Sequence, residues 1–141
     1  DAHIRQMARG HHPAQQLMRL RGIGENTATA LTAMVGNGHD FKCGRQFAAW
    51  LGLVPSQYSS GGRTRLGRIT KAGDAYLRSL LVMGARAVLA SAKNKTDRLS
   101  LWALELEKRR GYWKAVVAIA AKNARMAWAM FAKGEAFKLP A

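Results

Sequence analysis

The chain has 141 residues, of which 48% are hydrophobic, and a formal net charge of +15. This size and apolar content predict one domain with a single core, and the lack of any run of about 18 apolar residues argues against a membrane span. The basic residues cluster in a Gly-rich loop and not along an amphipathic helix, which argues against a membrane partner. So large an excess of positive charge favours a polyanionic partner, most often nucleic acid, over a merely solvated basic surface. The single cysteine, Cys43, excludes an intrachain disulfide and fits a reducing cytoplasm.

The first 13 residues have the character of a preceding helix that is ending. They are polar, and Gly10-His-His-Pro13 interrupts the helical pattern. We expect residues 1–13 to be the remnant of a helical linker, residues 14–134 to be the domain, and residues 135–141 to be a tail. On this interpretation the chain is a fragment of a longer protein.

Hydrophobic periodicity predicts an all-α fold of about six helices. The expected helices span residues 14–20, 25–35, 44–51, 70–92, 98–110 and 112–133. Thr70 is the candidate N-cap of the fourth helix, and Thr96 or Asp97 that of the fifth. The apolar stripe of the fourth helix is expected to include Leu77, Leu80, Leu81, Gly84, Ala87 and Val88.

The connection between the first two expected helices resembles a helix-hairpin-helix motif of DNA-binding proteins. In Leu20-Arg-Gly-Ile-Gly-Glu-Asn-Thr-Ala28, Gly22 and Gly24 allow a sharp turn and a close approach of the backbone to a partner. The following helix would direct its N-terminal N–H groups at a phosphate, next to Arg21. Such contacts do not read base sequence. The alternative is a helical hairpin that only packs.

The segment from Gly52 to Ile69 is the one long stretch without a helical period. Pro55 excludes a continuing helix, and Ser59-Ser-Gly-Gly62 is typical of a turn, so we expect a long Ser/Gly/Arg-rich central loop and allow for a short β-hairpin within it. No acidic residue lies between Asp40 and Asp74. The basic residues in that interval are Lys42, Arg45, Arg63, Arg65, Arg68 and Lys71.

A hydroxyl beside several guanidinium groups suits phosphoryl transfer. The oxygen would attack phosphorus while the arginines stabilise charge on the non-bridging oxygens. The alternative is that the arginines clamp phosphates and nothing reacts. The scattered carboxylates of this chain do not suggest an acidic metal cluster, so we expect no cofactor or metal in this domain.

Several blocks taken together resemble one family, the insertion-sequence transposases of the IS116/IS110/IS902 type, over about residues 17–137. The blocks are Gly22-Ile-Gly24, Phe41-x-x-x-Arg45-Gln-Phe-Ala-Ala49, Gly52-Leu-Val-Pro-Ser-Gln-Tyr-Ser-Ser-Gly61, Arg65-x-x-Arg68-Ile-Thr-Lys-x-Gly73 and Leu77-Arg78. The resemblance implies a C-terminal transposase domain, preceded in the whole protein by a RuvC-like nuclease domain with an acidic set that would use Mg²⁺.

The resemblance also implies a nucleophilic serine just after the Pro55-Ser-Gln-Tyr58-Ser59 segment, which is Ser60. This serine would attack a DNA phosphodiester, form a phosphoserine link and free a hydroxyl that later reverses the step. The family further implies a bacterial cytoplasmic location, a homo-oligomer, and a structured RNA encoded by the element. The fragment alone would then be inactive. We expect DNA contacts from Arg21, Gly22, Gly24, Arg45, Tyr58, Arg63, Arg65, Arg68 and Lys71.

Two other functions remain open at this point. The first is a non-catalytic helix-hairpin-helix module that binds nucleic acid through the connection at Arg21–Glu25 and the same basic loop. The second is a structural domain that oligomerises through the apolar faces of the helices at 70–92 and 112–133.

Overall fold

The computed structural model describes residues 12–35, 41–53, 55–60, 63–69 and 74–133. Within these ranges the fold consists of six helices and one two-stranded antiparallel hairpin, so the all-α expectation with an allowed hairpin is confirmed. The elements are α2 (His12–Leu17), α3 (Glu25–Val35), α4 (Gly44–Trp50), β1 (Pro55–Ser60), β2 (Arg63–Ile69), α5 (Ala75–Ala92), α6 (Arg98–Arg110) and α7 (Tyr112–Lys133).

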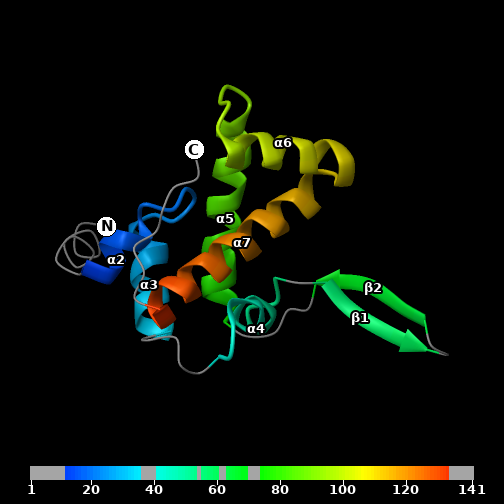
Figure 1. Cartoon of the computed structure of the whole chain (residues 1–141), viewed down its shortest axis with the longest axis horizontal. Coiled ribbons are helices and arrows are strands. Elements are labelled where there is room, and N and C mark those ends of the chain that lie inside the picture. Colours follow the sequence, from blue (N-terminus) through cyan, green and yellow to red (C-terminus); the bar gives the residue numbers. More distant parts are fainter. Residues whose placement is uncertain (1–11, 36–40, 54, 61–62, 70–73, 134–141) are drawn as a thin grey trace.

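Helix α7 is the centre of the fold. It contacts each of the other helices from α2 to α6, and in Figure 1 it runs diagonally across α5 between α6 and α4. Most of its inward-facing residues are small, and alanine at these positions lets neighbouring backbones approach closely. The fully buried residues of the core include Leu17, Leu20, Leu31, Phe47, Leu51, Leu77, Leu81, Leu89, Val116 and Ile119.

The start of α5 differs from the expectation. The helix begins at Ala75, and Asp74 is its N-cap, because the Asp74 carboxylate accepts a hydrogen bond from the Leu77 N–H at 2.9 Å. The prediction that Thr70 caps this helix was therefore wrong, although residues 70–73 themselves lie outside the described ranges. The predicted stripe was also wrong at Ala87, which is exposed. Alanine is inexpensive to expose, so its presence in an apolar pattern is weak evidence of burial.

The helix faces that the oligomerisation hypothesis assigns to an interface between copies are in contact within one chain. The apolar faces of α5 and α7 pack against each other within the chain and form the core. Helix α5 is also the one described helix that is long and apolar enough by composition to cross a membrane, with a mean hydropathy of 1.2. Its leucines at 77, 81 and 89 are buried in the core, and 33% of the helix is buried inside the domain.

The hairpin stands away from the helices. Strands β1 and β2 contact each other and, among the described elements, no helix. Figure 1 shows both strands extending to one side of the helical body. The register runs from Ser60 opposite Arg63 back to Pro55 opposite Ile69, with an irregularity between Pro55 and Gln57. The position of the hairpin is therefore set by its attachment to α4 and α5.

Candidate nucleic-acid interface

The attachment of the hairpin to the core begins at the end of α4. Leu51 follows the helix and is buried, and Gly52 turns the chain with a φ of +78°, a conformation that glycine adopts without strain. Leu53 is also buried and places the chain on the core just before the hairpin. The guanidinium of Arg78, on the first turn of α5, donates to the Leu51 carbonyl oxygen at 3.3 Å. The two helices that flank the hairpin are thus joined at its base.

Three aromatic rings pack together where the segment before α4 meets that helix. The ring centroids of Phe41 and Phe47 are 5.2 Å apart, and those of Phe41 and Trp50 are 5.6 Å apart. These tilted arrangements are favourable for aromatic pairs. The cluster holds the segment before α4 against the helix.

The hairpin register pairs four of the ten predicted site residues. Ser60 is the last residue of β1 and pairs with Arg63, the first residue of β2. Tyr58 pairs with Arg65, whereas Ser59 pairs with Thr64. The remaining predicted residues of this segment are Arg68, which lies on β2, and Lys71, which lies outside the described residues.

The predicted residue Arg45 lies on α4, where that helix crosses α7. Gly44 makes the crossing possible, because a Cβ atom at this position would come within 3.0 Å of the Cα atom of Arg125. Partial burial, and then the positive charge of Arg45, lower the pKa of Arg125 below its ordinary value. In the part of the chain that the structure describes, no salt bridge joins either guanidinium to a carboxylate. Two neighbouring guanidinium groups without such a partner form a candidate phosphate site.

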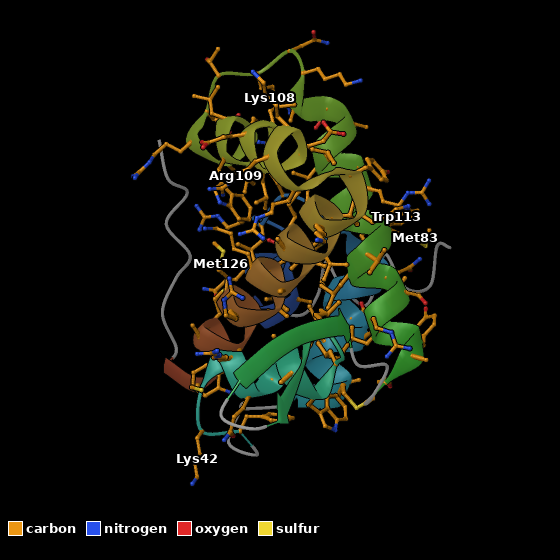
Figure 2. All side chains as sticks on the ribbon, turned by 90° about the vertical axis from the view of Figure 1, so that its right-hand side faces the viewer. Lys42, Met83, Lys108, Arg109, Trp113 and Met126 are labelled. Carbon is orange, nitrogen blue, oxygen red and sulfur yellow. The ribbon has the colours of Figure 1, made fainter. Side chains whose placement is uncertain are left out.

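Arg125 was missed by the sequence analysis. It lies in the middle of α7, eighty residues from Arg45, and the sequence pattern there indicates only an apolar core helix. Only the packing of α4 on α7 brings the two arginines together. Nearby, Lys42 extends away from the body of the molecule in Figure 2. Among the described residues, no group of His, Cys, Asp or Glu could hold a metal ion.

The predicted contact residue Arg21 is bonded within the chain. Its guanidinium donates to an Asp97 carboxylate oxygen at 2.7 Å and to the Ser100 hydroxyl oxygen at 2.8 Å. The Asn123 side-chain amide donates to the Arg21 carbonyl oxygen at 2.8 Å. Arg21 therefore connects the α2–α3 segment by hydrogen bonds to the start of α6 and to α7. Its expected contact with DNA stays a prediction, and its described role is structural.

Asp97 is the acidic partner in this network and the N-cap of α6, which confirms one of the two expected caps. The Ser100 hydroxyl donates to the Asp97 carboxylate at 2.7 Å, and the Ser100 N–H donates to it at 3.2 Å. The hydroxyl bond, then the N–H bond and the charge of Arg21, lower the pKa of Asp97 against a smaller opposing effect of desolvation.

The two glycines of the α2–α3 connection have different environments. Gly22 has a φ of +92°, and a Cβ atom there would lie 2.9 Å from a Val88 methyl group and 3.1 Å from the Gly84 carbonyl oxygen. Packing and backbone conformation together require glycine at this position. Gly24 is exposed, and nothing lies within 4 Å of the place where its Cβ would be. Only the second glycine is open to a partner.

The predicted contacts do not form one surface. In Figure 1 the α2–α3 connection lies on one side of the helical body, and the hairpin extends from the other side. The α2–α3 connection and strand β2 therefore lie on different sides of the helical body. The candidate interface therefore consists of two parts, the hairpin and the Arg45–Arg125 pair at the α4–α7 crossing, which α4 connects.

Comparisons with known proteins agree on one family. Residues 14–100 match the family model described as "Transposase IS116/IS110/IS902 family". The chain is 48% identical over 138 residues to a probable family 20 transposase of Pseudomonas aeruginosa. It is 41% identical over 138 residues to the transposase for insertion sequence element IS1111A of Coxiella burnetii, and 39% identical over 124 residues to that for IS1328 of Yersinia enterocolitica. These alignments cover 98%, 98% and 88% of this chain but only 40%, 38% and 37% of the respective relatives, so the chain spans about two fifths of their length.

Proposed function

Because the chain belongs to the IS116/IS110/IS902 transposase family, we propose that it is a transposase domain that binds DNA and supplies a serine nucleophile for strand cleavage and exchange. The hairpin is the reactive element in this proposal, and the helices hold its base. The observation that carries the proposal is the register of the hairpin, in which Ser60 pairs with Arg63 at the end farthest from the attachment to the core.

The register favours Ser60 over its neighbour as the nucleophile. Ser59 pairs with a threonine, whereas Ser60 and Tyr58 pair with arginines. Directly opposed residues in an antiparallel pair have Cα atoms about 4.5–5.5 Å apart, and we propose that Arg63, which the register sets opposite Ser60, binds the phosphate that Ser60 attacks. Guanidinium groups stabilise the charge that develops on the non-bridging oxygens.

The reaction is a transesterification and needs no external energy source. The Ser60 oxygen forms a bond to phosphorus and gives up its proton, and the bond from phosphorus to one deoxyribose oxygen breaks. The released oxygen takes up a proton and becomes a free hydroxyl. One phosphoester replaces another, so the same step in reverse joins the phosphate to a new strand.

Arg45 and Arg125 provide the binding energy next to the reactive element. Desolvation and the like charge of Arg45 both disfavour the charged form of Arg125 and lower its pKa in the free protein, and a phosphate between the two groups removes the repulsion. This contact is electrostatic and independent of base sequence. It supports an arrangement in which the DNA backbone passes over the α4–α7 crossing, on the helix that leads into the hairpin.

The other expected features of the whole protein belong to this proposal as well. The RuvC-like domain with its Mg²⁺ would lie in the part of the protein that the chain does not span, and the fragment alone would be inactive. A structured RNA and further copies of the protein would complete the assembly in the bacterial cytoplasm.

The test is a search for a covalent adduct between the full-length protein and labelled DNA, supplied with its RNA. After denaturation, the adduct is mapped by mass spectrometry in the wild type, in Ser60→Ala and in the matched control Ser59→Ala. We expect an adduct on Ser60 that persists in Ser59→Ala and is absent in Ser60→Ala, with DNA affinity unchanged in both. An adduct on Ser59 would correct the site, and cleavage without any adduct would refute the serine mechanism.

A second candidate function is a non-catalytic binding module that uses the α2–α3 connection. The exposed Gly24 at the start of α3 favours it, because nothing in the fold requires glycine there. Under this function no adduct forms, and Gly24→Val weakens duplex binding by blocking the approach of a phosphate to the backbone. The adduct assay therefore separates the two functions.

A further inference from the structure

An aromatic and cationic cluster lies where α7 begins, at Tyr112 and Trp113. The Arg86 side chain donates to the Tyr112 hydroxyl at 3.2 Å, and its guanidinium carbon lies 5.7 Å from the centre of a Trp113 ring. The rings of Tyr112 and Trp113 meet edge to face at 5.1 Å. Met83 precedes Arg86 by one turn on α5, and Figure 2 shows Met83 and Trp113 at the same edge of the molecule. We call these four residues the Trp113 cluster.

The Trp113 cluster is exposed although it is largely apolar. Trp113 is 60% exposed and Met83 is 63% exposed. Trp102 is different, because it packs against the core, half-buried, with Lys122 over its ring. The core therefore does not account for Trp113, and adjacent exposed apolar side chains commonly mark a binding surface. The contacts among Arg86, Tyr112 and Trp113 hold the indole in place before any partner arrives.

The charge around the cluster selects the kind of partner. Helices α5 and α7, which carry it, contain no Asp or Glu. Of their basic residues, Arg86 belongs to the cluster and Lys114 follows Trp113 directly in the chain. A second copy of the chain docked here by two-fold symmetry would place the same basic face on both sides of the interface. Like charges would then oppose each other, so the face is complementary to a polyanion and not to itself.

We propose that the Trp113 cluster binds an unpaired stretch of the DNA, with a base stacked on the Trp113 indole and a neighbouring phosphate beside Arg86. Exposed aromatic rings interleaved with cations are the usual means of holding single strands. In a duplex the base faces are covered by their neighbours, so the indole has a stacking surface only where bases are unpaired. This assignment rests on the proposed function, in which strand cleavage on DNA frees such ends.

The test measures the binding of the 141-residue chain to a fluorescent oligo(dT) and to a fluorescent duplex DNA by anisotropy. Trp113→Leu keeps an apolar side chain but removes the aromatic plane, and Trp113→Phe keeps a plane. We expect Trp113→Leu to weaken oligo(dT) binding by about 5- to 150-fold, Trp113→Phe to retain most of the affinity, and duplex binding to change in neither. Met34→Ala, which removes a 45% exposed side chain from α3, is the matched surface control.

The possible results separate this proposal from the proposed function. Oligo(dT) binding that is equal in Trp113→Leu and the wild type overturns the stacking assignment, whatever the duplex result. Preference for oligo(rU), with the same dependence on Trp113, overturns the assignment to DNA in favour of RNA. Failure of the wild type to bind the duplex counts against the proposed function instead. Arg86→Gln is the second variant, with a smaller loss expected on oligo(dT), should Trp113→Leu fail to fold.

Discussion

Gly84→Ala tests whether the α2–α3 connection is fixed to the core as the structure shows it. A methyl group on Gly84 would overlap the carbonyl oxygen of Gly22, and both groups belong to the backbone, so neither can rotate away. Overpacking of this kind costs about 1–3 kcal/mol. Displacement of the connection would also weaken the hydrogen bond from Asn123 to the Arg21 carbonyl oxygen, worth about 1 kcal/mol.

The helix propensity of alanine changes the free energy of unfolding in the opposite direction. Alanine is favoured over glycine in a helix interior by about 1 kcal/mol, which offsets part of the loss. We expect Gly84→Ala to lower the free energy of unfolding by about 2 kcal/mol net, equivalent to a fall in Tm of about 7 °C for a chain of this length. Thermal unfolding followed by circular dichroism at 222 nm, the far-ultraviolet helix signal, measures this shift.

Gly24→Ala is the matched control for this measurement. Its Cβ would meet no atom within 4 Å, and its φ is not positive, so we expect a change of less than about 0.5 kcal/mol. A Gly84→Ala variant as stable as the wild type, or more stable, would refute the close packing of Gly22 on α5. Helix propensity would then be the dominant effect at that position.

Two further predictions concern charge. Asp97→Asn should lower the unfolding midpoint near pH 7, and its difference from the wild type should shrink below about pH 4. The reason is that a carboxylate whose pKa is depressed in the folded state stabilises the fold only above its unfolded pKa, and this stabilisation is lost as the pH falls through the folded pKa. Denaturant titrations at several pH values check this, and a difference that persists at low pH would contradict it. Arg125→Gln should reduce the slope of log K against log salt for duplex DNA by about 0.9 per lost phosphate contact. Arg98→Gln, which changes an exposed residue on α6, should leave the slope unaltered. Equal slopes in the wild type and both variants would exclude the Arg45–Arg125 phosphate site.

Local patterns were sufficient to predict most of the helices. The bounds of α3, α6 and α7 agree with the expected 25–35, 98–110 and 112–133, because periodicity, a capping aspartate and glycine breaks all act within a few residues. The start of α5 was missed because Thr70 and Asp74 are both good caps. Gly73, a poor helix former, lies between them, and the helix begins after the second.

The candidate site was predictable only in part. The hairpin and its arginines could be named from a run of sequence without a helical period, and Ser60 came from family resemblance and not from physics. The partners of Arg21 are 76 and 79 residues away, at Asp97 and Ser100, and no local pattern could assign that arginine to the core. Arg125 and the exposure of Trp113 likewise depend on which helices pack together.

The central position of α7 has a consequence for how the chain is made. Every other described helix rests on α7, yet α7 is synthesised after all of them. Domains generally fold as units during synthesis, and here the helices that leave the ribosome first have no complete core to join until the last helix emerges. A premature stop codon ahead of Tyr112 would therefore leave exposed apolar helix faces and a target for chaperones and proteases, in place of a smaller working domain.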